Sequence, residues 1–311
     1  MPELQAELAD DVTRVRQSTL IGLYRDAQKL PLKPSKIRAH MAGSFLSAFK
    51  GRGMEFDESR PYQPGDDIRA LDWKVIARTS KPFTKVFREE RERPVLLMVD
   101  YRRPMFFGTR NAFKSVLAAK AAALLAWSCA QHGDRLGGLI FSEQEHQELR
   151  PQSGKAASLH FIKKLSEHSA WDNFKNAAAD EDAFKQALNR LRRVTRPGSL
   201  IFLISDFRHM DASAQASLAQ LARHNDLVLL FIHDPLEAEL PPAGYYRVSD
   251  GERELRLNTA SEHSRKNYQQ RFQQHQQFLE DMSRKLGMFF LSISTEDALS
   301  HKLQQGLGLR K

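Results

Sequence analysis

The sequence predicts an α/β protein with a doubly wound, mainly parallel sheet. Three short, continuous apolar runs support this prediction, at residues 94–100, 199–206 and 226–233. Runs of this kind are typical of strands that are covered on both faces. Segments with the apolar spacing of helices lie between them, and such strand–helix alternation places helices on both faces of a mainly parallel sheet.

Further segments complete the pattern. Apolar residues at three- and four-residue steps predict helices, alternating apolar and polar residues predict strands, and Gly and Pro mark the breaks. The expected helices span residues 3–29, 110–132, 154–168, 181–194, 211–223, 261–286 and 296–307. Further strands are expected over residues 82–88, 136–142, 146–150 and 288–293, with a hairpin over 245–257 around Asp250-Gly251. Residues 33–50 are basic and partly apolar, and they fit a short helix.

The composition suits one large domain, or a domain with an appendage. The chain has 311 residues, of which 41% are hydrophobic and 27% are charged. The formal net charge is +9, and the basic excess is divided between residues 1–93 and the rest of the chain. No basic arm and no nucleic-acid-binding motif is evident, so we expect no nucleic-acid partner.

The single cysteine, Cys129, lies in an Ala-rich helical segment and has no partner for a disulfide. A buried small hydrophobe is the expected role. The first residues carry acids where a signal peptide carries bases, and no run of about 20 apolar residues is present. These features predict a cytoplasmic protein without a membrane segment.

Residues 51–78, GRGMEFDESRPYQPGDDIRALDWKVIAR, differ from the rest of the chain. Acidic and basic residues are interleaved, and Phe56, Tyr62 and Trp73 give the segment something to bury. We interpret it as an ordered, ion-paired loop region. The alternative is a polar surface loop whose ion pairs contribute little stability.

This segment, continued by FTKVFREERERPVLLMVD, resembles the signature of the domain-of-unknown-function family fifty-eight. The resemblance covers residues 40–207 and, more weakly, the remainder. It implies a von Willebrand factor A-like fold and a partnership with a MoxR-type AAA+ ATPase. We therefore expect an N-terminal extension over residues 1–93, made of a helix and the charged signature. A von Willebrand A-like α/β domain would follow over residues 94–311.

Two acidic residues end predicted central strands, Asp100 and Asp206. In doubly wound sheets, ligands bind outside the carboxyl ends of the strands. The resemblance implies a Mg²⁺ site here, built on a D-x-S-x-S motif and a distant threonine. The two serine positions fall on Arg102 and Pro104, however, and no threonine stands near residues 171–179. The site at Asp100, Arg102 and Asp206 is therefore predicted to be degenerate, and no cofactor is expected.

An arginine side chain could take the place of the metal at this site. We hypothesise that Arg102 or Arg103 places its guanidinium between Asp100 and Asp206, because its rigid fork of five donors suits two carboxylates. Alternatively, the two carboxylates cap the turns that follow them and the arginines are solvated.

No enzymatic activity is expected. His132, His160, His233 and His275 lack the Ser, Cys or Asp spacing of a triad, and the chain has no phosphate-binding glycine motif. The main hypothesis is an adaptor for a MoxR-type AAA+ ATPase, acting with an unknown client protein in assembly, maturation or stress-related remodelling. Two alternatives remain: a Mg²⁺-dependent domain that grips a partner's carboxylate, and a hydrolase with an acidic cluster.

The predicted docking residues all lie in the signature segment, where their alternative role is purely structural, stapling the extension to the sheet. They are Arg60, Tyr62, Asp66, Asp67, Arg69, Asp72, Trp73 and Arg78.

Overall fold

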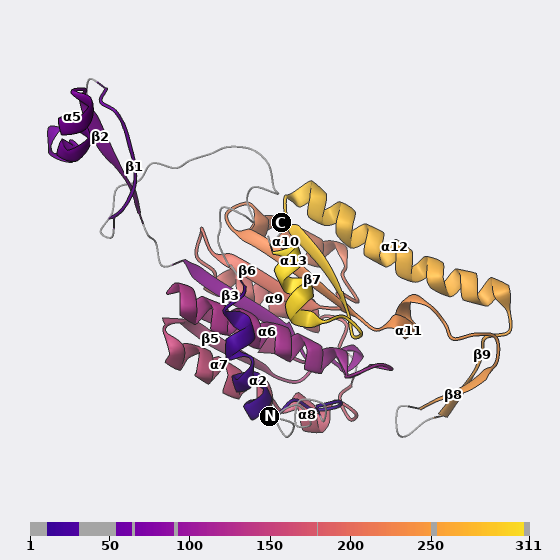
Figure 1. The fold of residues 1–311 in the computed structure, drawn as a ribbon. Coiled ribbons are helices and arrows are strands. Elements are labelled where there is room, and N and C mark those ends of the chain that lie inside the picture. Colours follow the sequence, from indigo (N-terminus) through magenta and orange to yellow (C-terminus); the bar gives the residue numbers. More distant parts are fainter. Residues whose placement is uncertain are drawn as a thin grey trace. The chain divides into compact units, whose positions relative to one another are not determined.

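The computed structural model describes residues 11–30, 54–63, 66–89, 93–178, 180–249 and 254–307. The chain forms two compact units, which can be followed by colour in Figure 1. Unit 1 comprises Met1–Ala42 and Arg93–Lys311, and unit 2 comprises Gly43–Glu92. Each is described by itself. The helix predicted over residues 33–50 lies outside the described residues.

Unit 1 is built on a six-stranded sheet with the order β10-β7-β6-β3-β4-β5. Its strands are β3 (Pro94–Asp100), β4 (Arg135–Phe141), β5 (His146–Ser153), β6 (Leu200–Ser205), β7 (Asp226–His233) and β10 (Phe289–Ser294). All neighbours pair in parallel except β5, which runs antiparallel to β4 as a hairpin partner. The predicted doubly wound fold is confirmed. Strand order reverses between β3 and β6, which is where such sheets bind ligands.

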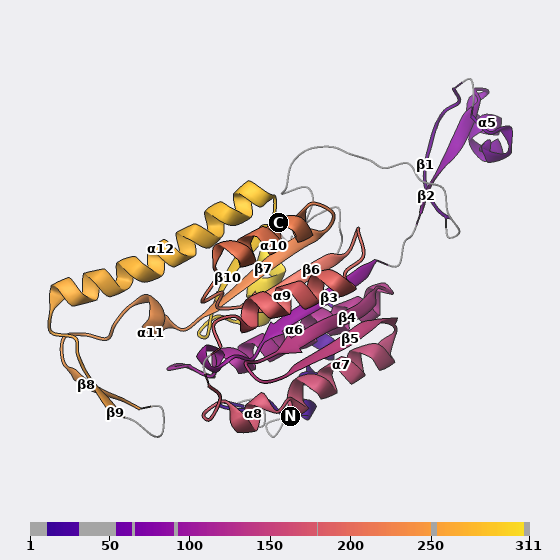
Figure 2. The same cartoon turned by 180° about the vertical axis from the view of Figure 1, so that it is seen from behind.

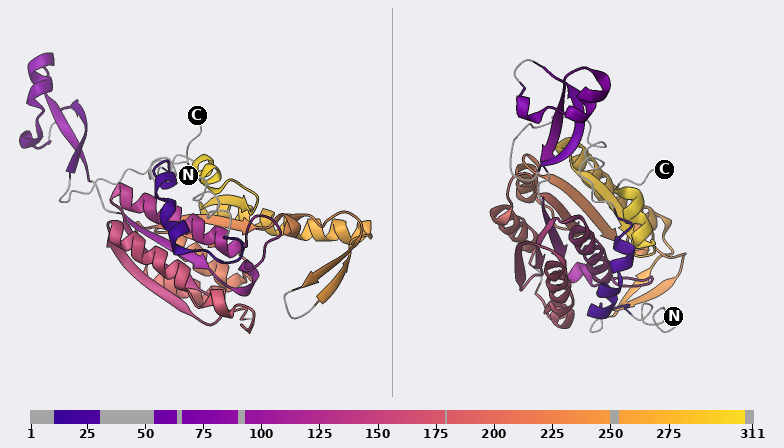
Figure 3. Two further views of the ribbon diagram at one scale, coloured as in Figure 1. Left: turned by 60° about the horizontal axis from the view of Figure 1, so that its bottom comes forward. Right: turned by 60° about the vertical axis from the view of Figure 1, so that its left-hand side comes forward.

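Helices cover both faces of this sheet (Figures 1 and 2). One face packs against α6 (Lys114–His132), α7 (Lys155–Glu167) and α13 (Leu299–Gly306). The other packs against α9 (Ala183–Val194), α10 (Ala212–Ala222) and α12 (Glu262–Leu286). Alternate residues of β3 serve the two cores: Val95 and Val99 face the first, whereas Leu96 and Met98 face the second. The layers can also be followed in Figure 3.

The N-terminal segment differs from the single predicted helix. Within the described residues 11–30, only α2 (Gln17–Gly22) and α3 (Tyr24–Ala27) are helical, and residues 11–16 are not. The first part of the predicted helix, residues 3–10, lies outside the described residues. The carboxylate of Asp11 accepts hydrogen bonds from the backbone N and the Nε of Arg16, which holds a turn in place of a helix. Trp127 Nε1 on α6 donates to the carbonyl of Leu20 at 3.0 Å. These residues therefore pack on unit 1, whereas the predicted division at residue 93 grouped them with the signature.

The helix predicted from residue 110 begins four residues later, at Lys114. Asn111 has φ 54°, a left-handed conformation that interrupts a helix, and the Phe113 N–H donates to the carbonyl of Val12. The helix predicted from residue 296 likewise starts at Leu299. The first boundary involves a contact with Val12, which is distant in the sequence.

Smaller elements surround the carboxyl edge of the sheet. They are η2 (Arg103–Met105), α8 (Ala170–Asn173), α11 (Pro235–Ala238) and the hairpin of β8 (Tyr245–Ser249) with β9 (Glu254–Asn258). The hairpin confirms the predicted one, although its turn at Asp250-Gly251 lies outside the described residues. Leu279 and Met282 of α12 are buried in the second core, so this helix packs against its own domain.

Unit 2 corrects the prediction of a loop region. It contains β1 (Met54–Pro61), η1 (Ile68–Ala70), α5 (Trp73–Thr79) and β2 (Phe83–Glu89). β1 and β2 form an antiparallel pair with an irregularity between Phe56 and Glu58. The dense charge and turn-forming residues suggested a loop because apolar and polar residues alternate only over residues 54–57 of β1, and the polar Glu58, Ser59 and Arg60 follow.

Candidate functional site

The candidate site begins where β3 and β6 end side by side. These strands pair in parallel, with Val99 opposite Ile204, so Asp100 and Asp206 emerge at the same edge of the sheet. Both acids are buried, with 0% and 2% of their surface exposed. Two carboxylates this close and this dry require cations or strong donors nearby.

Arg102 supplies the cation. Its Nε lies 3.0 Å from Asp100 Oδ1 and its Nη2 lies 2.7 Å from Asp100 Oδ2, while Nη2 is 3.7 Å from Asp206 Oδ1. The side chain is 2% exposed, and its guanidinium carbon lies 5.0 Å from the centre of the Phe184 ring. The hypothesis that an arginine fork joins the two acids is confirmed for Arg102. Arg103 instead donates its backbone N–H to Glu143 Oε1 at 2.7 Å.

The turn-capping alternative is correct in part. Asp100 Oδ1 also accepts the Arg102 backbone N–H at 2.9 Å, and Asp206 Oδ1 accepts that of Arg208 at 3.1 Å. Ser205 Oγ donates to Asp100 Oδ2 at 2.6 Å. The carboxylates therefore cap their turns and bind Arg102 at the same time, and Arg102 is buried rather than solvated.

A second buried cation, Lys114, was missed from the sequence. It opens α6 and is fully buried, with its Nζ 2.9 Å from Asp206 Oδ2 and 2.7 Å from Glu237 Oε1 on α11. Arg208 Nη2 reaches the same Glu237 oxygen at 2.6 Å. The available signal was a lysine at the start of an otherwise apolar, Ala-rich helix.

We call these six side chains the ion network: Asp100, Arg102, Lys114, Asp206, Arg208 and Glu237. It holds three acids and three bases, so its formal charge is zero. Burial alone would raise the pKa of Asp206, but the charges of Lys114, Arg102 and Arg208 hold that pKa well below its usual range. Asp206 therefore stays ionised, and the network ties together β3, β6, α6 and α11.

The residues present do not fit a divalent cation. Such ions need several free oxygen ligands, and here the oxygens of Asp100 and Asp206 accept from Arg102, Lys114 and Ser205. Arg102 and Pro104 provide no hydroxyl. Within the described ranges, no group of three or more His, Cys, Asp or Glu is placed to hold a metal.

Two further residues, Asp234 and Phe207, help to fix the loops around the site. Asp234, which follows β7, caps α11 and accepts hydrogen bonds from the Thr109 backbone and hydroxyl and from Thr295. Phe207 is buried and has φ 53°, an uncommon conformation for a bulky residue. The loops after β3, β6 and β7 are therefore fixed by specific contacts.

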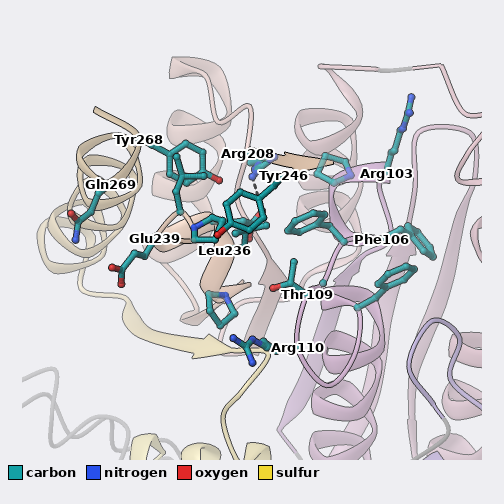
Figure 4. Close-up of a pocket in the computed structure, with 18 of the residues that line it drawn as sticks. Arg103, Phe106, Thr109, Arg110, Arg208, Leu236, Glu239, Tyr246, Tyr268 and Gln269 are labelled. Atoms are coloured by element: carbon teal, nitrogen blue, oxygen red, sulfur yellow. Dashed lines mark hydrogen bonds and ion pairs between the residues drawn. The ribbon is translucent and has the colours of Figure 1, made fainter. Parts of the chain in front are cut away.

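A large cleft opens above the ion network within unit 1 (Figure 4). Its volume is about 1930 Å³. The loop after β3 and the segment after α8 form one side, and the β8 strand with the first turns of α12 forms the other. In Figure 4, Phe106, Arg208, Tyr246 and Tyr268 lie around the opening.

In unit 2, the structure separates the predicted docking residues into two groups. Arg60 Nη2 pairs with Asp66 Oδ1 at 2.7 Å, and Asp66 Oδ2 accepts from the Gln63 N–H at 2.9 Å. Asp72 begins α5: it accepts from the Lys74 and Val75 N–H groups and, at 2.6 Å, from the Ser59 hydroxyl. The hydrogen bonds from Arg60 and Ser59 lower the pKa values of Asp66 and Asp72, respectively. These residues hold unit 2 together.

The remaining predicted docking residues face solvent to differing degrees. Trp73 is 68% exposed on α5, and Arg69 and Arg78 are exposed nearby in sequence. Asp67 is exposed and accepts the Arg69 N–H at 3.0 Å, and Tyr62 is half-buried. An exposed tryptophan flanked by cations is the part of unit 2 best suited to bind another molecule.

Cys129 is buried in α6, and burial raises the pKa of its thiol well above the usual value. It therefore has the inert, small-hydrophobe role expected. Among the described residues, no helix is both long enough and apolar enough to cross a bilayer.

The fold and site define a doubly wound α/β protein whose crevice is filled by its own ion network and which carries a second, charged unit. The chain belongs to the family described as "Protein of unknown function DUF58", which it matches over residues 58–278.

The chain is also similar to individual proteins. The chain is 30% identical over 217 residues to the "Uncharacterized protein Rv1480" of Mycobacterium tuberculosis, which covers 70% of this chain and 67% of the relative. The chain is also 38% identical over 65 residues to the "Uncharacterized protein YeaD" of Bacillus subtilis. This shorter match covers 21% of this chain and 15% of that protein. Among solved structures, the conserved hypothetical protein BatB from Bacteroides thetaiotaomicron is similar, with 14% identity and a TM-score of 0.44. That alignment covers 69% of this chain and 97% of BatB.

Proposed function

We propose that this chain is a non-enzymatic interaction protein that serves as an adaptor for a MoxR-type AAA+ ATPase in the assembly, maturation or remodelling of other proteins. The ATPase partner follows from the family resemblance of residues 51–78. The observation that carries the binding role is the exposure of Trp73 on a unit in which Asp66 and Asp72 are already engaged.

The division of labour within unit 2 supports this role. Asp66 and Asp72 are engaged by Arg60, Ser59 and backbone N–H groups, so they serve the fold. Trp73, with Arg69 and Arg78, is left for a partner. Tryptophan and arginine are the residue types that most often dominate binding energy at protein interfaces.

The ion network supports a binding role over catalysis. A general acid or base needs a proton that can be exchanged near neutral pH, whereas the pKa of Asp206 is held far below that range. Asp100 is buried and engaged by Arg102 and Ser205. The crevice is therefore better suited to support a surface than to carry out a reaction.

The experiment is an affinity purification of the tagged chain from its own cells with a non-hydrolysable ATP analogue, followed by binding measurements with the purified ATPase. We expect the ATPase to co-purify with the wild-type chain. Trp73→Ala should weaken binding at least tenfold while leaving the melting temperature unchanged, because the side chain is exposed.

Two variants act as controls. Tyr245→Ala removes an equally exposed ring, 80% accessible, from unit 1 and should bind as the wild type does. Asp72→Ala should loosen unit 2, because it removes the cap of α5 and the partner of Ser59. If no AAA+ ATPase co-purifies, or if Tyr245→Ala weakens binding as much as Trp73→Ala, the proposal is wrong.

A further inference from the structure

The size of the cleft in unit 1 restricts what it can hold. Its volume of about 1930 Å³ is roughly twice that of the largest ordinary small-molecule pockets, which run to about 1000 Å³. A metabolite or nucleotide would leave most of this space filled with water. A chain-like molecule that lies along the cleft would fill this volume.

The charge of the cleft restricts the chemistry of that chain. Eight Arg and Lys side chains and seven Asp and Glu side chains line it, which leaves almost no net charge. At the floor, Arg102 is already paired with Asp100, and Arg208 with Glu237. A polyanion such as a nucleic acid binds to surfaces with a clear cationic excess. Mixed charge instead complements a polypeptide, which carries both signs.

Aromatic rings supply anchoring points on both sides of the cleft. Phe106 stacks on Phe174 with ring centres 4.3 Å apart on one side. Tyr246 of β8 and Tyr268 of α12 lie on the other (Figure 4). Rings separated by charged groups fit side chains spaced along a peptide better than they fit a continuous lipid tail.

Backbone hydrogen-bonding groups are also available beside these rings. Among the described strands, β8 pairs only with β9, so each has a free edge. Free strand edges bind extended peptides by adding a strand, and pockets for alternate side chains then give specificity. Tyr246 and Arg247 of β8 are both part of the cleft lining.

From these observations we infer that the cleft at the carboxyl edge of the sheet binds an extended, unfolded polypeptide segment of another protein. This inference deepens the proposed adaptor function and rests on it, since it gives the class of client that the adaptor would present. The ion network forms a rigid, neutral floor, and the client's apolar side chains bind between the aromatic rings above it.

The test uses the full chain and a permanently unfolded probe, fluorescein-labelled α-lactalbumin that has been reduced and carboxymethylated. Binding is followed by fluorescence anisotropy. We expect Tyr246→Ala and Tyr268→Ala, which remove rings from two different elements, each to weaken binding about tenfold. That corresponds to about 1.4 kcal/mol, the range of a good interface anchor.

Tyr245→Ala is the matched control. Tyr245 precedes Tyr246 on β8, points to the opposite face of the strand, and is absent from the cleft lining. It should bind within twofold of the wild type. None of these substitutions changes the net charge, so non-specific attraction between the basic chain and the acidic probe is the same for all.

Three outcomes would overturn the inference: no binding of the probe by the wild-type chain, equal losses for Tyr245→Ala and Tyr246→Ala, or a single-stranded oligothymidylate that binds the same site more tightly. Melting curves establish that each variant is folded. The assay contains neither ATPase nor ATP and leaves Trp73 unchanged. Its failure would therefore leave the ATPase test standing, and failure of the ATPase test would leave this binding result standing.

Discussion

At the scale of single residues, the chemistry of this protein is set by charged and polar groups that are buried with their partners. Arg102 and Lys114 are 2% and 0% exposed, and each bridges two acidic side chains. Removing one partner from such a pair is costly, because an uncompensated charge is left in a dry environment. His168 is a contrasting case, since it is buried as a neutral ring.

His168 should make stability depend on pH. Its ring is fully buried, and Nδ1 accepts the Ala170 N–H at 3.2 Å, while Nε2 has no hydrogen-bond partner in the described part of the chain. Burial lowers its pKa from 6.5 to about 4, against the opposing charge of Glu145. Between these values the unfolded chain binds a proton that the folded chain does not, so stability rises with pH across this window.

The expected size is roughly 3 kcal/mol between pH 4 and 6.5, with no contribution from His168 above pH 7. Urea unfolding of the wild type and of His168→Asn, measured from pH 4.5 to 7.5, checks this. Asparagine keeps an acceptor for Ala170 but does not titrate. Because His233 also has a lowered pKa, the difference between the two proteins is the informative quantity. Parallel pH profiles would contradict the expectation.

At the scale of elements, close packing explains why one strand contains a glycine. This residue, Gly138, lies in neither a turn nor a loop. Gly138 lies inside β4, where an added Cβ would sit 2.3 Å from the Leu97 carbonyl oxygen and 2.8 Å from Phe161 on α7. The helix α7 can pack this close to the sheet only because no side chain is present there.

Two glycine-to-alanine substitutions should therefore change stability in opposite directions. Gly138→Ala should lower the free energy of unfolding by roughly 1–3 kcal/mol, as overpacking does. Gly22→Ala, at the end of α2 with nothing within 4 Å of its added Cβ, should raise it by about 0.4–1 kcal/mol. Urea denaturation measures both. Equal effects at the two positions would mean that local propensity, and not packing, decides them.

At the scale of the whole molecule, the ion network joins elements that are distant in the sequence. Lys114, Asp206 and Glu237 come from α6, the end of β6 and α11, and Arg102 adds the end of β3. His275 on α12 donates from Nε2 to the Asp206 carbonyl at 3.0 Å. A change at the network should therefore weaken unit 1 as a whole.

We expect Arg102→Ala to lower the free energy of unfolding by roughly 3–5 kcal/mol, because Asp100 would lose its buried partner. Arg110→Ala is the control: its side chain is 67% exposed, so its effect should stay within about 0.5 kcal/mol.

Millimolar Mg²⁺ should leave the melting temperature of the wild type unchanged. A Mg²⁺-dependent increase that disappears in Asp100→Ala would show that a metal competes with Arg102 after all.

The fold class, and the presence of an acid and nearby arginines at the end of β3, could be predicted from residue type and spacing. The short apolar runs at residues 94–100, 199–206 and 226–233 have the length and composition of strands that are buried on both faces. An arginine and a proline at the serine positions led to the hypothesis that a guanidinium, from Arg102 or Arg103, meets Asp100 and Asp206, and the structure shows that it is Arg102. These are local properties, set by residue type and spacing.

Which side chains complete the ion network, and which side chains remain exposed, depends on the tertiary structure. Lys114 and Glu237 are 123 positions apart, and nothing in either local sequence marks them as partners. Asp72 and Trp73 are neighbours in one charged segment, yet one caps α5 and the other faces solvent. The same holds for Tyr245 and Tyr246, which are consecutive rings on β8, only the second of which lines the cleft. Contacts between distant segments make these distinctions, because burial depends on what the rest of the chain packs against each side chain.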